Sequence, residues 1–425
     1  MQTRRQSPWL ALGTLSAIAT VGFIDRIVVN VLVEPLKAEF GLSDAQVSLM
    51  AWAFALLNVV AGFVTARYAE RVRRLSLITA GVLFWSLATA LCGAAANWTQ
   101  LLVARMGVGL GEAIGLPPNQ SVIADYFPAS KRGLAMSVLL LSPPLGAFIG
   151  FVGGGWIAQT YGWQVTFLVA AIPGFILGLV AWVFVAEPPR GQFDAESADD
   201  VPPISAFVQR IASLPSARNI IAGGFIASGL SYALNFFFAS LLVRKFGLGL
   251  AEAGLYTGLL ASLPAALSII GAGWLGDRLG ARHPGAYALI PGLAMLVGGP
   301  LAALGLLQDD LTVLLACIAG SIFLTMGYLG LTFATVQNLM HPRMRATASA
   351  TMNGLFTVAG GLGPSLVGLL SDRLSLIHGE AQGLAMAMAA GALVYVWAAA
   401  HYLQAARHLR ADMARIGASA KTASA

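Results

Sequence analysis

The sequence predicts an all-α integral membrane protein with twelve transmembrane helices in two pseudo-symmetric six-helix bundles. Of its 425 residues, 57 % are hydrophobic and only 10 % are charged, whereas soluble domains carry about 25 % charged residues. Stretches of about 20 apolar residues, enough to cross a bilayer, recur along the chain. One polar segment near the middle divides these stretches into two sets of six.

The expected spans follow from hydrophobic length. The first six are 8–33, 45–68, 76–95, 98–124, 133–160 and 164–186. The second six are 219–243, 251–276, 285–307, 311–338, 346–371 and 380–404. We therefore predict an N-terminal bundle over 1–186 and a C-terminal bundle with a cytoplasmic tail over 219–425. Proline and acidic residues mark 187–218 as a cytoplasmic linker, with room for a short surface helix.

Basic residues predict the orientation. With both termini in the cytoplasm, 19 of the 25 Lys and Arg residues fall on the cytoplasmic side, 4 fall outside, and Arg26 and Arg105 lie within spans. The positive-inside rule favours this topology. The net charge of +6 is scattered over short loops, so we expect no nucleic-acid partner. We expect a monomer in the inner membrane of a bacterium.

The two halves repeat. "AERVRR" after the second span corresponds to "GDRLGAR" after the eighth, and "YFPASKRGLAMS" corresponds to "MHPRMRATASA". Duplicated halves of this kind enclose a central binding site in secondary transporters. The stretch "GWLGDRLGAR" resembles the loop signature of the major facilitator superfamily. The first-half copy of this loop departs from the signature by carrying Glu70 in place of an aspartate. Within the superfamily, the motifs "FIDR", "GVGLGEA" and "IADYFP" are similar to those of the Spinster group.

Four ionisable residues lie inside predicted spans of the first half: Asp25, Arg26, Arg105 and Glu112. Charges within a bilayer are costly, so they are usually functional. Asp25 and Arg105 lie at similar depths and could pair, and Glu112 follows Arg105 by two helical turns. A buried carboxylate is costly when charged, and a nearby arginine stabilises its charged form. A movement that changes the distance between the carboxylate and the arginine would therefore load and release a proton.

We predict Glu112 as the better proton carrier because it is deeper, and Asp25 as the alternative. The arginines stay charged, so Arg26 and Arg105 are expected to hold counter-charges or an anionic substrate. Substrate contacts are expected mostly from uncharged residues, namely Asn119, Tyr232, Asn235, Phe236, Tyr328 and Asn353. A charged region facing an apolar wall suits an amphiphile with an anionic head.

Loops and glycines predict the moving parts. Charged residues in the loops after the second and eighth spans are expected to latch a cytoplasmic gate, namely Glu70, Arg71, Asp277 and Arg278. Glycines four residues apart at Gly146, Gly150 and Gly154 allow close helix packing. They resemble the fifth-helix signature of exporters in the superfamily.

The expected function is proton-coupled secondary transport by alternating access. The Spinster resemblance implies lysophospholipids or sphingoid-type anionic amphiphiles as substrates. The alternative is a proton-coupled symporter of small organic anions such as sugar acids and other carboxylates, a group that shares the Asp-Arg pair. We find no phosphate-binding loop, no metal-ligand spacing and no nucleophile–base pair, so we expect no enzyme, no metal and no cofactor apart from the coupling proton.

Overall fold

The computed structural model describes residues 7–69, 72–190, 204–340 and 344–423, and the described residues form helices joined by short turns, with no strand. Eleven of the helical segments are long and apolar enough to cross a membrane. The prediction of an all-α membrane protein is thus confirmed. The predicted fourth span is missing from these eleven because Arg105 and Glu112 make it less apolar than its neighbours.

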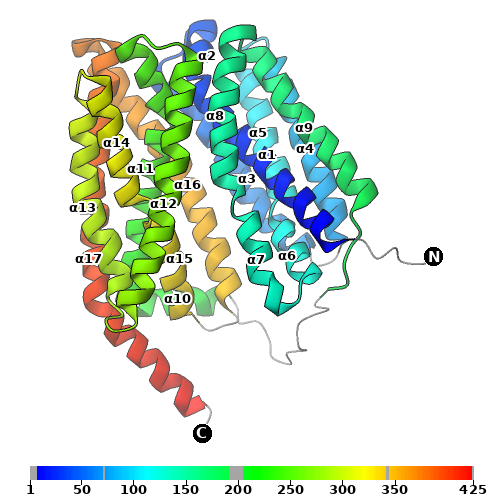
Figure 1. The fold of residues 1–425 in the computed structure, drawn as a ribbon, viewed down its shortest axis with the longest axis vertical. Helices are drawn as coiled ribbons and strands as arrows, with labels where there is room; N and C mark the ends of the chain where they lie inside the picture. Colours follow the sequence, from blue (N-terminus) through cyan, green and yellow to red (C-terminus); the bar gives the residue numbers. More distant parts are fainter. Residues whose placement is uncertain (1–6, 70–71, 191–203, 341–343, 424–425) are drawn as a thin grey trace. The chain divides into compact units, whose positions relative to one another are not determined.

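The chain divides into two compact units. Figure 1 colours the helices along the sequence, from blue at the N-terminus to red at the C-terminus. Unit 1 comprises Met1–Ser197 and Asn235–Ser262, and unit 2 comprises Ala198–Leu234 and Leu263–Ala425. A segment from the second half of the sequence thus groups with the first half. The predicted bundles, 1–186 and 219–425, follow the duplication in the sequence, and these boundaries stay a prediction.

Unit 1 is built from nine complete helices. They are α1 (Pro8–Val31), α2 (Val33–Phe40), α3 (Asp44–Ala69), α4 (Arg74–Gly93), α5 (Trp98–Gly115), α6 (Pro117–Tyr126), α7 (Ala129–Leu139), α8 (Ser142–Tyr161) and α9 (Trp163–Phe184). The end of α11 (Pro215–Phe246) and the beginning of α12 (Leu250–Gly280) complete the unit.

Unit 2 contains the remainder of α11 and α12 and six further helices. These are α10 (Ile204–Ser213), α13 (Ala286–Leu306), α14 (Leu311–Thr325), α15 (Tyr328–Leu339), α16 (Arg345–His378) and α17 (Glu380–Ala423). The short α10 is the expected linker helix. Its Phe207 is buried in the core of the unit, together with Tyr395 and Tyr402 from α17.

The fourth and tenth spans are each two helices instead of one. Asn97 caps α5 by accepting a hydrogen bond from the Gln100 backbone N–H (2.9 Å), and Asp310 caps α14 at Val313 in the same way (3.0 Å). Pro117 and Pro118 remove backbone donors after α5, and Gly327 separates α14 from α15. The two halves therefore share a cap and a break, as a duplication predicts.

The glycines of α8 pack against α1. A Cβ on Gly146 would lie 2.4 Å from Phe23 Cβ, and one on Gly154 would lie 2.9 Å from Val28 Cγ2. Gly150 sits opposite Ile27 between them. The sequence correctly marked this stripe as a close helix contact, and the structure places it against the helix that carries Asp25 and Arg26.

Candidate functional site

The candidate site, here called the central cluster, consists of Asp25 and Arg26 on α1 with Arg105 and Glu112 on α5. Asp25 and Glu112 are fully buried, and Arg105 is 3 % exposed. The Arg26 side chain is 25 % exposed. All four belong to unit 1, and their formal charges sum to zero.

Small residues on α5 allow its neighbours to approach the cluster closely. A Cβ at Gly109 would lie 2.3 Å from the backbone oxygen of Phe54 on α3. One at Gly111 would lie 2.7 Å from Cβ of Trp85 on α4. Real side chains do not tolerate such distances, so both positions depend on glycine. The motif "GVGLGEA" thus packs α3 and α4 tightly around the two charges of α5.

Glu112 is paired with Arg26. The Arg26 Nε donates to Glu112 Oε2 at 2.5 Å, across the interface between α1 and α5. The Arg26 guanidinium also lies over the rings of Phe23 (5.1 Å) and Phe54 (5.0 Å). Such cation–π contacts stabilise a cation that has left water.

Arg105 binds the backbone of α1 and leaves the Asp25 carboxylate alone. Its Nη1 donates to the Asp25 carbonyl oxygen at 3.1 Å, and its guanidinium lies 5.7 Å from the Phe54 ring centroid. The expected side-chain pair between Asp25 and Arg105 is therefore wrong for this conformation. The two residues are neighbours, as expected, but the geometry aims the guanidinium at the main chain.

Several polar atoms of the central cluster are buried and have no hydrogen-bond partner among the residues that the structure describes. These are both carboxylate oxygens of Asp25, Oε1 of Glu112 and Nε of Arg105. Buried polar groups are nearly always satisfied in folded proteins, and an exception calls for an explanation such as a bound ion, a bound water or a functional role. The central cluster thus has unused capacity for a proton and for an anion.

Two amides lie around the same helices. Asn119, near the start of α6, donates to the carbonyl of Leu15 on α1 at 3.4 Å, while its buried Oδ1 has no partner. Asn235 on α11 accepts from Asn30 on α1 at 3.1 Å. Phe236 is buried beside Phe237, ring centroid to ring centroid 4.9 Å. These three predicted contact residues belong to unit 1.

The remaining predicted contact residues lie in unit 2. Tyr328 is buried in the core of that unit and packs near Phe356, with ring centroids 6.4 Å apart. Tyr232 is 46 % exposed, and Asn353 is exposed on α16. Tyr328 therefore contributes to the packing of unit 2 in this conformation. The ring of Tyr232 lies against Gly360 of α16, where a Cβ would meet it at 3.1 Å.

The predicted gate residues are only partly described. Glu70 and Arg71 lie outside the described residues. Asp277 and Arg278 are exposed at the end of α12, where Asp277 accepts a hydrogen bond from the Tyr287 hydroxyl at 3.0 Å. The Arg278 guanidinium lies 5.3 Å from the ring of Trp274, one turn earlier. Their contacts in this structure are local to unit 2.

Two features of unit 1 were missed from the sequence. Phe54 lies under both arginines of the central cluster, but a phenylalanine in a membrane span gives no signal of this. The second feature is a buried group of charges, here called the α2–α11 cluster: Glu34, Lys37, Asp44 and Arg244. Its members lie at the ends of predicted spans, where charges are common, so the sequence did not single them out.

The α2–α11 cluster is densely paired. Arg244 donates to Glu34 Oε1 from Nε (2.9 Å) and Nη2 (2.7 Å), and to both oxygens of Asp44 at 2.6 and 2.8 Å. Lys37 Nζ donates to Asp44 Oδ1 at 2.5 Å. The cluster fastens the end of α11 to α2 and to the start of α3.

A third group of charges explains the motif "IADYFP". Arg74, at the start of α4, donates to Asp125 on α6 (2.5 Å) and to Glu187 after α9 (2.8 Å). Arg74 is 4 % exposed. This group holds three segments of the first sequence half together at one end of unit 1.

A multi-span helical protein with two duplicated halves and a buried, incompletely paired set of charges belongs to the class of secondary transporters. The family model of the Major Facilitator Superfamily matches residues 14–368. The chain belongs to this superfamily and is an integral membrane transporter related to the Spinster proteins.

Known relatives agree with this assignment. The chain is 29 % identical over 411 residues to an MFS-type efflux pump of Mycolicibacterium smegmatis, covering 95 % of this chain and 94 % of the relative. It is 27 % identical to human protein spinster homolog 1, covering 86 % and 73 %. It is 23 % identical to a probable galactarate/D-glucarate transporter of Bacillus subtilis, covering 62 % of each chain.

A solved structure shares the fold. The crystal structure of a bacterial homolog of the human lysosomal transporter Spinster, in an inward-facing and unoccupied conformation, has a TM-score of 0.88 and 28 % identity. The match covers 96 % of this chain and 99 % of that chain. The Spinster-like resemblance predicted from the short motifs is confirmed.

Proposed function

We propose that the protein is a proton-coupled transporter of anionic amphiphiles, of the lysophospholipid or sphingoid type, and that it works by alternating access. The observation that carries this proposal is the uneven pairing within the central cluster. Glu112 has a guanidinium partner, whereas the equally buried Asp25 has no hydrogen-bond partner for either carboxylate oxygen.

The proton is carried by the two carboxyl groups in turn. Asp25 holds it in the present conformation, because an uncharged carboxyl avoids the cost of burying an unpaired charge. Glu112 is charged here, since Arg26 compensates it. The sequence favoured Glu112 as the carrier. The geometry favours Asp25 for this state, and Glu112 takes the proton when Arg26 moves away.

The anionic head binds to the arginines. With Asp25 protonated, the central cluster carries two guanidinium charges and one carboxylate, so one positive charge is left for a ligand. Arg105 has a free buried Nε for a phosphate or carboxylate oxygen. A proton on Asp25 and an anion on Arg105 therefore favour each other, because each offsets the charge of the other.

Aromatic surface beside the arginines favours an amphiphile. Phe23 and Phe54 lie within about 5 Å of the Arg26 guanidinium, so a charged head here would meet apolar surface directly. The 27 % identity to the sphingosine-1-phosphate transporter SPNS2 of Danio rerio, over 55 % of this chain, supports this class. The alternative is a small organic anion such as a sugar acid, supported by the kinship to the probable galactarate/D-glucarate transporter and by the presence of two arginines in one site.

The α2–α11 cluster supports alternating access. It ties α11, from the second half of the sequence, to α2 and α3 of the first half. Transport requires that the two sequence halves separate at one end of the molecule while they close at the other. We propose that this cluster closes one entrance and must break when that entrance opens.

Orientation and setting complete the proposal. The excess of Lys and Arg on one set of loops favours a topology with both termini in the cytoplasm, in which the α2–α11 cluster would face outward. We propose the inner membrane of a bacterium as the setting. We propose that the transporter acts as a monomer, with the proton as coupling ion.

The experiment is flux into liposomes that contain the purified protein and an internal pH-sensitive dye. Lysophospholipids and sugar acids are offered in turn to the wild type, Asp25→Asn and Glu112→Gln. We expect acidification with lysophospholipids only. The proton flux of each variant should be at least tenfold lower than that of the wild type. A positioned carboxyl group typically speeds proton transfer by about a hundredfold or more.

Binding measurements separate the two carboxyl groups. Substrate affinity of the wild type should rise as the pH is lowered, because protonation of Asp25 leaves a positive charge for the anion. Asp25→Asn should bind equally well at acidic and alkaline pH. Flux with sugar acids alone would favour the alternative, and unchanged proton flux in both variants would refute proton coupling through this cluster.

A further inference from the structure

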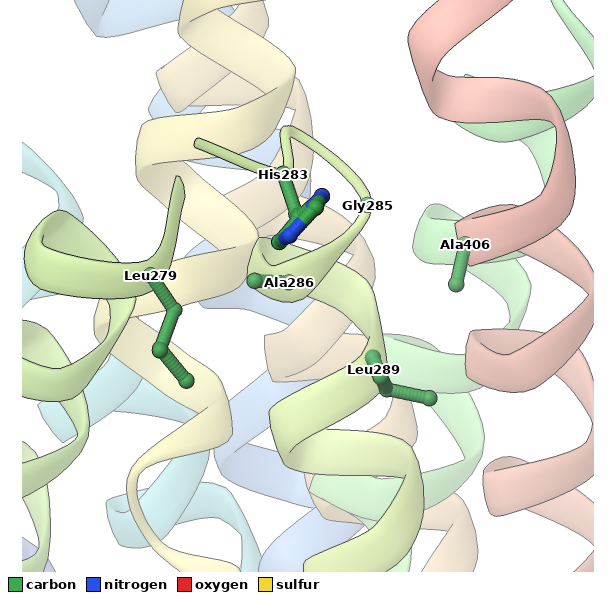
Figure 2. A pocket seen from close by; sticks show the side chains of 6 residues that line it. All are labelled: Leu279, His283, Gly285, Ala286, Leu289 and Ala406. Atoms are coloured by element: carbon green, nitrogen blue, oxygen red, sulfur yellow. The ribbon is translucent and has the colours of Figure 1, made fainter. Parts of the chain in front are cut away.

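An apolar groove lies at one end of unit 2, far along the chain from the central cluster. Its volume is about 250 Å³, and it is lined by Leu279, His283, Gly285, Ala286, Leu289 and Ala406. Figure 2 shows side chains from the end of α12, the start of α13 and α17 around it, with the His283 ring in the connecting turn. All lining residues belong to unit 2.

The groove lies where the outer surface of unit 2 changes from apolar to basic. Earlier in α17 the exposed side chains are apolar, with Trp397 60 % exposed, whereas Arg407 and Arg410 are exposed next to the groove. On α12 the exposed Trp274 directly precedes the charged turn. Tryptophan gathers at the level of the lipid headgroups, so the groove opens at the membrane–water boundary.

Basic residues surround the mouth of the groove. Four arginines adjoin the lining residues in the chain, and all are exposed: Arg278, Arg282, Arg407 and Arg410. The backbone of Ala406 lies against Gly285, where a Cβ would meet the Ala406 oxygen at 2.9 Å, so the α12–α13 turn and α17 are in contact. The arginines of the two segments are thereby brought to one place.

The nearby acids are already engaged. Asp412 is buried and accepts from the Ser216 backbone N–H (3.0 Å) and hydroxyl (2.6 Å). Asp277 accepts from the Tyr287 hydroxyl. With four arginines against two aspartates, this end of unit 2 is positively charged beside an apolar groove.

We infer that this groove binds an anionic phospholipid of the surrounding bilayer, separately from the transported substrate. An acyl chain would lie on Leu279, Leu289 and Ala406, and the phosphate would lie among Arg282, His283 and Arg407. Charge complementarity selects the headgroup, since basic pockets between helices at the cytoplasmic surface bind anionic lipid heads. The lipid would brace the α12–α13 turn against α17.

The test measures lipid retention by the full-length, delipidated protein, using native mass spectrometry. The ligands are phosphatidylglycerol, phosphatidylcholine with the same chains, and glycerol phosphate. We expect phosphatidylglycerol to bind preferentially. Because a basic residue near an anionic lipid contributes about fivefold in affinity, Arg282→Gln combined with Arg407→Gln should weaken its binding by roughly 10- to 30-fold.

Two controls make the test decisive. Lys131→Gln with Arg345→Gln removes two exposed basic residues elsewhere and should leave phosphatidylglycerol binding unchanged. Leu289→Trp fills the groove without changing the charge and should weaken that binding severalfold. Equal loss in the charge control, equal affinity for phosphatidylcholine, equal competition by glycerol phosphate, or unchanged binding by Leu289→Trp would each overturn the proposal. None of these results depends on substrate transport.

Discussion

The central cluster and the α2–α11 cluster are built from the same residue types but are paired very differently. Both contain two acids and two bases in unit 1. In the α2–α11 cluster, Arg244 and Lys37 together supply five hydrogen bonds to two carboxylates. In the central cluster, one ion pair stands beside a carboxyl group with no hydrogen-bond partner.

This difference separates a closure from a binding site. A densely bonded charge cluster holds segments in one arrangement, and it releases them only when all its bonds break together. An incompletely bonded cluster destabilises the protein. Such a cluster is expected at a site where a proton or a ligand completes the hydrogen bonding. We therefore propose coupling for the central cluster and closure for the α2–α11 cluster.

The largest expected effect is the loss of one partner in the central cluster. Arg26→Met would leave Glu112 fully buried and without its guanidinium, which should destabilise the protein by about 3–5 kcal/mol at a pH where Glu112 stays charged. Thermal unfolding in detergent measures the change. The double variant Arg26→Met with Glu112→Gln should recover most of the stability. If it were as unstable as the single variant, the pair would not be the source of the loss.

Removal of Arg244 should have the next largest effect. Arg244→Met should cost about 2–3 kcal/mol, less than the full cost of an unpaired buried charge, because Lys37 still binds Asp44 and Glu34 is partly exposed. Lys37→Met should cost under about 1 kcal/mol, since Arg244 continues to hold Asp44. A thiol reagent should label cysteines introduced near α2 faster in Arg244→Met than in the wild type, and no faster in Lys37→Met. Equal labelling in both variants would argue against a closing role.

Packing around the central cluster is sensitive to one methyl group. Gly109→Ala would force its Cβ against the Phe54 backbone and should cost about 1–3 kcal/mol. It should also reduce flux, because Phe54 contacts both arginines. Gly153→Ala on α8, where a Cβ would meet no atom within 4 Å, is the matched control. Thermal unfolding and flux of the two variants check this, and a neutral Gly109→Ala would be a contradiction.

The smallest expected effect concerns the amide pair between α1 and α11. Asn30→Ala removes the 3.1 Å hydrogen bond to Asn235, and interhelical hydrogen bonds in membranes contribute about 0.6 kcal/mol. Stability should change little. If the two amides only link helices, Asn30→Ala and Asn235→Ala should change substrate affinity equally little. A much larger loss of affinity in Asn235→Ala would support the predicted contact between Asn235 and the substrate.

Much of the fold could be predicted from local sequence. Hydrophobic length located the spans, because a bilayer requires about 20 apolar residues wherever a helix crosses it. Repeated loop motifs indicated the duplication. The breaks after Gly115 and Thr325 were missed, since a hydrophobicity pattern continues across Pro117 and Gly327, where the hydrogen bonding of the helix does not.

The sequence by itself determined that Asp25, Arg26, Arg105 and Glu112 are functional candidates, because charged residues in an apolar span need a reason to be there. Only the tertiary structure determined which charged side chains pair with one another. Arg26 rather than Arg105 pairs with Glu112, and both arginines lie over the ring of Phe54. Arg244 binds Glu34 on α2 and Asp44 on α3, which lie 210 and 200 residues away in the chain. Pairing depends on the rotation and approach of whole helices, and these follow from glycine contacts spread over several helices, which no local pattern encodes.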